Sequence, residues 1–297
     1  MSTPTIPEHY PEIWDNGWVS ALQTADSRFT GAFTMDTASG DRKWYNIGGT
    51  LEFKQKTERY PETTYVAYST GKSWLTPDAW DAPVLFDKWD QAFLDSIVLP
   101  TSRVMMDQAA AFQRLRDSYV RDAIQGTRTT GASGGTTETF PTANVIDVDE
   151  DDGSTDTGLT WFKIKRAKKL MDTLRVPLSD RYFAIAAAQV EDLMSMAQAT
   201  DRDYAMTSLI KEGQIHGTMW AGFKWIQYED LSYDASDADA RQCLAFSKND
   251  IVLAESGMQT YMDVLPTRSH ALQIRPDVML GSCRINNSSI IVKCLEA

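Results

Sequence analysis

The segment from Thr101 to Gln125 constrains the fold more than any other part of the chain. It reads TSRVMMDQAAAFQRLRDSYVRDAIQ, with Pro100 before it, Gly126 after it and hydroxyl residues at its start that can cap the free amides of a helix. Its apolar side chains recur every three or four residues, at Met105, Ala109, Phe112, Leu115, Tyr119 and Ala123. This spacing predicts one amphipathic helix of about 35 Å whose stripe lies on something broad and flat.

The chain ahead of this helix has little apolar material from which to build a core. Residues 1–40 carry Pro4, Pro7 and Pro11, which favour an extended arm lying on another part of the structure. From Arg42 to about Trp89 the pattern becomes strand-like, as in TTYVAYST, with charged stretches such as KQKTERYPETT. A two-stranded excursion of this kind cannot stabilise itself, so it needs a partner surface.

The second half of the chain predicts a compact α/β layer. After a Gly-, Thr- and Asp-rich connection over residues 126–158, WFKIKRAKKLMDTLRVP predicts a helix, RYFAIAAA a buried strand and AQVEDLMSMA a second helix. The residues expected to face inward on the two helices are Ile164, Ala167, Leu170, Met171 and Leu174, and Val190, Leu193, Met194 and Ala197. From His216 onward, short strands are expected, separated by turns such as Asn286-Asn287, with a brief helix near SKNDIVLAE.

Composition excludes several classes of protein. Of the 297 residues, 29 are basic and 41 acidic, and a formal charge of -12 argues against a surface that grips nucleic acid through its phosphates. Cys243, Cys283 and Cys294 lie in apolar segments without CxxC spacing, which predicts reduced core cysteines. The start of the chain lacks the pattern of an export signal, and no stretch has the apolar length of a membrane span, so neither export by that route nor a membrane contact is expected.

The candidate chemical sites are weak. In DVDEDDGSTDTG, Asp147, Asp149 and Asp151 have the spacing of a calcium loop, but Asp152 and Gly158 occupy positions where that loop needs glycine and glutamate. We therefore expect a solvated acidic loop. Lys163, Arg166 and Lys169 are expected on the solvated face of their helix, serving solubility or subunit contacts and not DNA recognition.

His9, His216 and His270 are the only histidines, and no motif joins a nucleophile, a base and an orienting group. Gly213, Gly217 and Gly222 lie four and five residues apart, too far to present consecutive amides to a phosphate. GTMWAGFKWIQY is expected to form one buried strand, with the glycines marking turns and close backbone approach. The sequence thus predicts no catalytic, cofactor-binding or metal-binding residues, no cofactor and no enzymatic activity.

The order of these elements resembles the major capsid proteins of tailed bacteriophages with the HK97-type fold. The resemblance covers roughly residues 40–297 and rests on DSYVRDAIQGTRTTG, VPLSDRYFAIAAAQVEDLM, LIKEGQIHGTMWAGFKWIQYEDL and RINNSSIIVKCLEA. It implies an α+β fold with an N-terminal arm (1–40) and a peripheral domain (41–157). That domain holds an extended E-loop (about 45–85), which reaches over a neighbouring subunit, and a long spine helix (about 101–125). It further implies an axial α/β domain (158–256) and last strands (257–297) that return to the peripheral domain.

The function that this resemblance implies is self-assembly into pentamers and hexamers of an icosahedral head shell. Such a shell encloses double-stranded phage DNA without sequence-specific binding and is located in the virion, after assembly in the host bacterial cytoplasm. The short, non-helical start of the chain favours a separate scaffolding protein, and a portal and a decoration protein are further possible partners. The alternatives are an encapsulin-like cellular compartment, or a soluble α+β enzyme or ligand-binding protein whose site the sequence does not reveal.

Overall fold

The computed structural model describes residues 26–38, 40–49, 51–60, 62–63, 65–86, 101–150, 156–196, 215–235 and 239–296, with only the backbone described at 101–103. Within these ranges it has three sheets and three α-helices: α2 (Thr101–Gln125), α3 (Trp161–Thr173) and α4 (Ala187–Ser195). This is the α+β composition that the sequence predicted. The predicted arm before residue 26 lies outside the described residues.

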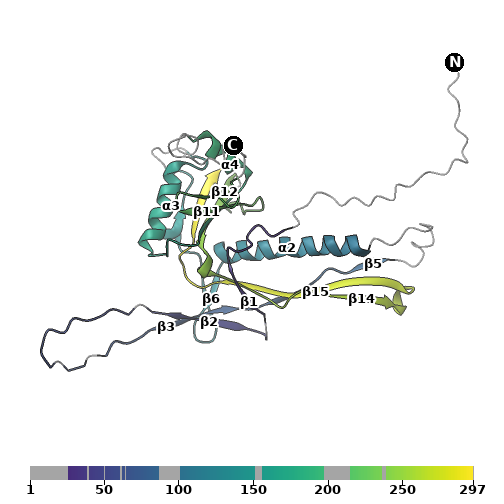
Figure 1. Ribbon diagram of the computed structural model, residues 1–297, viewed down its shortest axis with the longest axis horizontal. Coiled ribbons are helices and arrows are strands. Elements are labelled where there is room, and N and C mark those ends of the chain that lie inside the picture. The colour runs from purple at the N-terminus through teal and green to yellow at the C-terminus, as the bar shows by residue number, and fades with distance from the viewer. Residues whose placement is uncertain are drawn as a thin grey trace, which may run out of the picture.

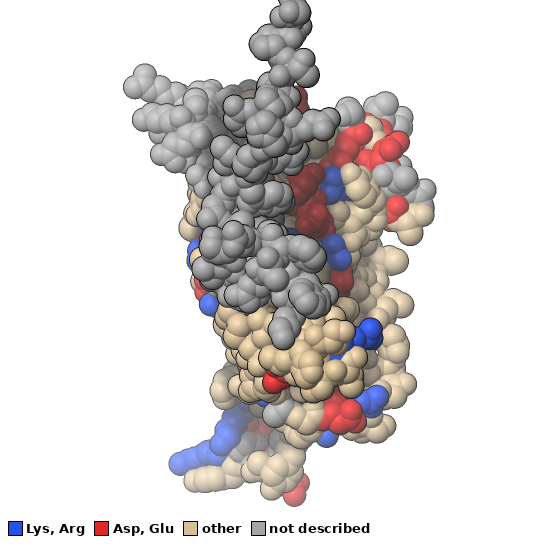
Figure 2. All heavy atoms as spheres, turned by 90° about the vertical axis from the view of Figure 1, so that its right-hand side faces the viewer, with Lys and Arg blue, Asp and Glu red and all other residues tan. Residues whose placement is uncertain are grey.

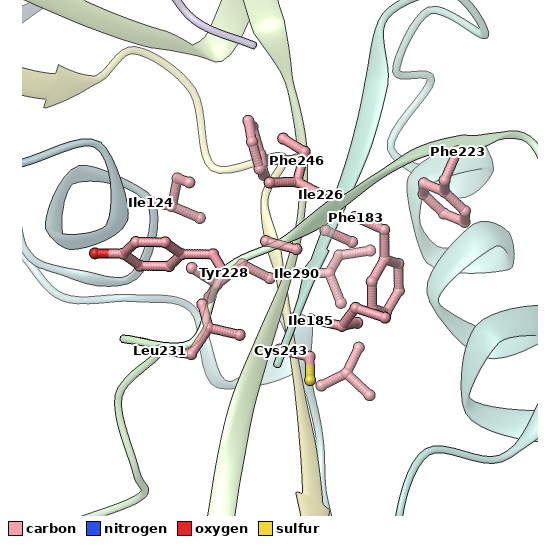
Figure 3. Packing of buried hydrophobic residues seen from close by; sticks show 14 of the residues in the cluster. Ile124, Phe183, Ile185, Phe223, Ile226, Tyr228, Leu231, Cys243, Phe246 and Ile290 are labelled. Carbon is pink, nitrogen blue, oxygen red and sulfur yellow. The ribbon is translucent and has the colours of Figure 1, made fainter. Parts of the chain in front are cut away.

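One six-stranded sheet forms the core beneath α3. Its order is β10-β11-β9-β12-β16-β8. The strands are β10 (Met219–Trp220), β11 (Phe223–Gln227), β9 (Arg181–Ile185), β12 (Ala240–Ser247), β16 (Ile290–Leu295) and β8 (Val145–Ile146). The Phe183 and Trp225 rings stack with centroids 4.7 Å apart, and both side chains are completely buried. Figure 3 shows Phe183 and Phe223 toward one helix and Ile124, from the end of α2, on the opposite side of the strands. We call this sheet with α3 and α4 the upper unit.

The second six-stranded sheet carries α2. Its longest strand is β15 (Ala271–Arg284), of 14 residues, and Figure 1 shows α2 lying along this strand. The other strands are β1 (Thr34–Thr37), β13 (Ile251–Glu255), β14 (Gln259–Leu265), β4 (Asp78–Asp81) and β5 (Val84–Phe86). β1 pairs in parallel with β13, so the end of the predicted arm is a strand of this sheet. We call this sheet with α2 the lower unit.

A third sheet has the order β2-β3-β6-β7 and carries a long hairpin. Its strands are β2 (Lys43–Gly48), β3 (Thr70–Leu75), β6 (Arg128–Thr130) and β7 (Thr136–Glu138). The short 3₁₀ helices η1 (Thr142–Asn144), η2 (Lys248–Asp250) and η3 (Pro266–Arg268) complete the fold. Figure 1 shows the hairpin loop between β2 and β3 pointing away from both units.

The chain passes directly from one unit to the other at two neighbouring places. It passes from β12 to β13 through η2, and from β15 to β16 through residues 285–289. The Asp250 carbonyl accepts from the Ile285 amide at 2.8 Å, and its carboxylate accepts from the Asn286 amide at 3.2 Å and from the Ser288 hydroxyl. Burial raises the pKa of Asp250, and these hydrogen bonds oppose the rise. One buried carboxylate therefore ties the two crossings together.

The prediction of a single strand over residues 219–227 is wrong. Ala221 and Gly222 have φ of 52° and 87°, and they form the two-residue turn of a hairpin between β10 and β11. Gly217 has φ of 79° and lies in a turn, which confirms the reading of the glycines as turn markers. Gly213 lies outside the described residues.

Candidate interaction surfaces

The stem of the hairpin is fixed to the body of the chain. β2 and β3 pair along their whole length, and β3 pairs on its other side with β6. The Trp74 indole donates to the Gly131 carbonyl at 2.7 Å, and Lys72 Nζ lies 4.2 Å from the centroid of the Trp44 ring. These contacts set the direction of the stem within one copy of the protein.

In the loop beyond the stem, residues 49–69, the large apolar side chains that the structure describes are exposed. The exposed fractions are 108% for Phe53, 90% for Tyr65 and 86% for Tyr60, and Leu51 is exposed at 62%. Single exposed apolar residues are ordinary, but several of them on one projecting loop mark an interaction surface. Residues 78–86, which the sequence placed in the same excursion, instead lie in β4 and β5 on β15.

The apolar stripe predicted on α2 is only partly covered in one copy. Phe112, Leu115 and Tyr119 are half-buried against the core, whereas Met105 is 39% exposed. The buried positions toward the middle and end of the helix are Ala110, Asp117, Val120, Ala123 and Ile124. The prediction that the whole stripe lies on a broad surface is therefore wrong at Met105 within one copy. The helix packs on the upper unit and the arm as well as on its own sheet. The apolar periodicity of its sequence indicated a single surface and did not reveal the contacts with the upper unit and the arm.

Asp117 anchors the described end of the arm. Its carboxylate accepts from the Ser27 hydroxyl at 2.5 Å, from the Arg28 amide at 2.8 Å and from the Phe29 amide at 3.5 Å. Burial raises the pKa of Asp117, and these hydrogen bonds limit the rise. Phe29 is completely buried, with its ring 5.0 Å from that of Tyr228. The arm therefore joins α2 to the upper unit. Sequence reasoning missed Asp117, because a buried carboxylate in a helix looks like a solvated residue.

An apolar pocket of about 200 Å³ lies between α2 and its sheet. Its apolar lining comes mainly from Ala111, Phe112, Leu115, Trp80, Met258 and Val278. The Trp80 indole donates to the Tyr119 hydroxyl at 2.8 Å, and this hydroxyl donates to the Asp78 carboxylate at 2.9 Å. The chain of hydrogen bonds holds the Trp80 ring at the wall of the pocket.

A second, more polar pocket of about 550 Å³ shares Trp80, Asp81 and Val278 with the first. Asp81 lies directly opposite Asp277 in the pairing of β4 with β15. Arg275 pairs with Asp277 at 3.1 Å. Because like charges at directly opposed positions destabilise a sheet, this edge favours the approach of a further cation.

The basic face predicted on α3 is wrong at Lys163. This side chain is completely buried, and its ammonium donates to the backbone carbonyls of Thr157 (2.7 Å), Gly158 (3.0 Å) and Lys293 (3.0 Å). A lysine with such acceptors can be buried, although its spacing in the sequence is that of a surface residue. Arg166, by contrast, is partly exposed and pairs with Glu150 at 2.9 Å, and Lys169 is exposed.

Buried arginines are further charged residues of the core that the sequence did not predict. Arg241 contacts Glu296 at 2.7 Å and Glu229 at 3.2 Å. Burial opposes ionisation of Glu296, but hydrogen bonds from Arg241, Tyr233 and Gln189 outweigh it and lower the pKa of this carboxyl. Burial lowers the pKa of Arg284 to about 10. No local motif distinguishes these arginines from surface residues.

The other sequence candidates do not come together into a chemical site. His216 Nδ1 accepts from the Gln227 amide at 3.3 Å, and burial lowers the pKa of His216. Asp147 pairs with Lys293 at 2.9 Å, whereas His9 and Asp151 lie outside the described residues. The three cysteines are free and buried, as predicted. Within the described ranges, no group of three or more His, Cys, Asp and Glu side chains could hold a metal ion.

Charge is dispersed on the face that Figure 2 presents. The described atoms there belong mostly to uncharged residues, with basic and acidic side chains interspersed. Among the described residues, no helix is both long enough and apolar enough to cross a membrane.

Both a protein-family model and solved structures match this chain. A family model described as phage capsid protein matches residues 6–296. Among solved structures, the capsid of Ralstonia phage GP4 aligns with a TM-score of 0.74 and 11% identity, covering 100% of this chain and 99% of that one. The capsid of cyanophage P-SCSP1u aligns with a TM-score of 0.72 and 16% identity, covering 98% of this chain and 94% of that one.

The capsid of cyanophage Pam1 aligns with a TM-score of 0.73 and 12% identity over the full length of both chains. A search of curated proteins finds no significant match. At these identities the structural matches show the fold, and the family model shows the family. The chain therefore belongs to the phage capsid protein family, and its fold is the HK97-like capsid fold that the sequence resemblance implied.

Proposed function

We propose that copies of this protein form the pentamers and hexamers of an icosahedral head shell that encloses double-stranded phage DNA. The observation that carries the proposal is the family match over residues 6–296, because it extends over nearly the whole chain. The exposed aromatic side chains of the projecting loop support it, since a shell protein needs apolar contacts between copies. The acidic balance of the chain supports enclosure of DNA without tight binding.

The proposed peripheral domain is the lower unit, and the proposed axial domain, at the centre of each pentamer and hexamer, is the upper unit. This division differs from the boundary expected at residues 256 and 257. β13 precedes that boundary yet pairs with β15, and β16 follows it yet pairs with β12. In this scheme α2 is the spine helix, and residues 49–69 are the part of the E-loop that reaches over a neighbouring copy.

The proposed role is purely structural, with no catalysis and no cofactor. Assembly takes place in the host bacterial cytoplasm, with a separate scaffolding protein and a portal, and a decoration protein is a further candidate partner. The encapsulin-like compartment is the near alternative, since it shares the fold. The match to phage capsid proteins favours the virion.

The test is to purify the protein and examine it by size-exclusion chromatography and negative-stain electron microscopy. Closed shells, or pentamers and hexamers that close when scaffolding protein is added, are the expected result. A protein that stays monomeric at high concentration, with and without scaffolding protein, would contradict the proposal and favour a soluble α+β enzyme or binding protein. DNA inside particles from infected cells separates a phage head from a cellular compartment.

A further inference from the structure

We infer that the apolar pocket beside Trp80 in one copy receives the Phe53 ring of a second copy, while Lys54 of the same loop meets the carboxylates of Asp81 and Asp277. This inference rests on the proposed function, because it names the surface on which the loop of one copy would lie. It commits to one occupant, a second copy of this chain, and to one anchoring side chain.

The loop cannot fill the pocket of its own chain. Figure 1 shows the tip between β2 and β3 extending away from the layer formed by α2 and β15, between which the pocket lies. The stem is held by the Trp74–Gly131 hydrogen bond and by the pairing of β3 with β6. A contact between Phe53 and this pocket therefore has to join two copies.

The pocket suits a phenyl ring in size and in chemistry. Apolar cavities of about 150 Å³ take up benzene, and this pocket measures about 200 Å³. The polar lining residue Gln108 already donates its amide to the carbonyls of Ala82 (2.9 Å) and Ile274 (3.3 Å). A phenyl ring asks for no further hydrogen bond from Gln108, and the second polar lining residue, Asp81, is the one that Lys54 would meet, whereas the tyrosine side chains of the loop would bring a hydroxyl.

Charge favours the same segment. Asp81 and Asp277 face each other across β4 and β15, and the only ion pair found at these two residues within the described ranges joins Asp277 to Arg275. Lys54 follows Phe53 directly in the sequence, and the long, flexible stem of a lysine can bring its ammonium back to the surface that the neighbouring ring enters. The apolar and the polar pocket share Trp80, Asp81 and Val278, so one extended segment can offer a ring to the first and an ammonium to the second.

The contact is head to tail, because the surface that gives and the surface that receives are different. Such a heterologous contact continues from copy to copy and either closes into a ring or extends without limit. The loop of each copy would thus set the direction of assembly around a pentamer or hexamer.

A cysteine pair tests this contact. Phe53→Cys and Ala111→Cys are combined in one chain, particles are assembled, and disulfides are formed with a mild oxidant. The native cysteines are buried, which keeps the background low. The expected result is a ladder of covalent oligomers on a denaturing, non-reducing gel. The control pair Phe53→Cys with Leu178→Cys uses another exposed position, in the upper unit, and should give no ladder.

The inference would be overturned if the Phe53→Cys, Ala111→Cys variant formed normal particles but its chains stayed monomeric on the gel, or cross-linked no more than the control pair. That result would leave the proposed function intact. If the double variant does not assemble, two further variants decide. Ala111→Leu, which fills the pocket, and Phe53→Ala should each lower shell yield at least about tenfold, whereas Tyr60→Ala should not. Wild-type yield from the first two variants also overturns the inference. Unmodified protein that forms no shells contradicts the proposed function instead.

Discussion

The core sheet of the upper unit and the projecting loop use the same kinds of side chains in opposite ways. Trp225 and Phe183 are completely buried within one chain, whereas Phe53 and Tyr65 are almost completely exposed. Since burial of apolar area is the main stabilising contribution to folding, the first pair stabilises the monomer and the second pair does not. The difference indicates that the apolar residues divide into a set that folds the chain and a set left for contacts between copies.

The largest expected effect on folding is at Trp225. Trp225→Ala removes a buried ring that stacks on Phe183 and leaves a cavity, so the free energy of unfolding should fall by about 3–5 kcal/mol. Tyr65→Ala, its counterpart on the loop, should change it by less than about 0.5 kcal/mol. Urea unfolding of unassembled protein measures both. If both variants lost the same free energy of unfolding, the loop would stabilise the monomer as much as the core sheet does, which would contradict the comparison.

The next effect separates the two sides of α2. Ile124 is completely buried, so Ile124→Ala should cost about 2–5 kcal/mol. Leu115 is half-buried beside the apolar pocket, so Leu115→Ala should cost only about 1 kcal/mol in the unassembled protein. The same unfolding experiment ranks them. A larger loss at Leu115 would mean that the helix buries the stripe predicted from its sequence.

Lys163 and Lys169 lie on one helix and give a matched pair. Lys163→Met removes the ammonium that donates to three backbone carbonyls in a part-buried site, and should lower the free energy of unfolding by about 1–3 kcal/mol. Lys169 is exposed, so Lys169→Met should stay within about 0.5 kcal/mol of the wild type. Thermal and urea unfolding of both variants give the comparison. Equal free energies of unfolding for the two variants would mean that Lys163 lies on the solvated face of α3, as the sequence predicted.

The smallest expected effect depends on pH. The pKa of Glu296 is lower in the folded protein than its ordinary value, so its ionised form contributes stability that is present above about pH 4.5 and lost as the pH falls through the folded pKa. Glu296→Gln should therefore be less stable than the wild type at pH 7, and the gap should narrow below about pH 4. Unfolding curves from pH 7 to pH 3 test this, and a gap that stays constant would contradict it.

The sequence predicted those elements whose apolar pattern is local. The helix over 101–125, the strand at Arg181–Ile185 and the helix at Ala187–Ser195 were found in this way. The boundary between units was not predictable, because β13 and β16 are both short apolar strands and nothing local distinguishes which sheet each will join.

The interaction surfaces were predictable only in outline. A polar, strand-like excursion was evident from the sequence, but its division into a projecting loop and the strands β4 and β5 depends on pairing with β15, about 200 residues farther along the chain. The buried charges at Asp117 and Lys163 could not be predicted, because each is stabilised by backbone groups that only the fold brings close.

The most direct test of this division is to replace residues 51–68 with a Gly/Ser linker of equal length and to measure folding and assembly separately. We expect the free energy of unfolding of the unassembled protein to stay within about 1 kcal/mol of the wild type, since every side chain that the structure describes in this segment is exposed. We expect closed shells to disappear from electron micrographs. A loss of several kcal/mol would show that the loop stabilises the monomer, and normal shells would show that assembly does not need it; either result would contradict the account.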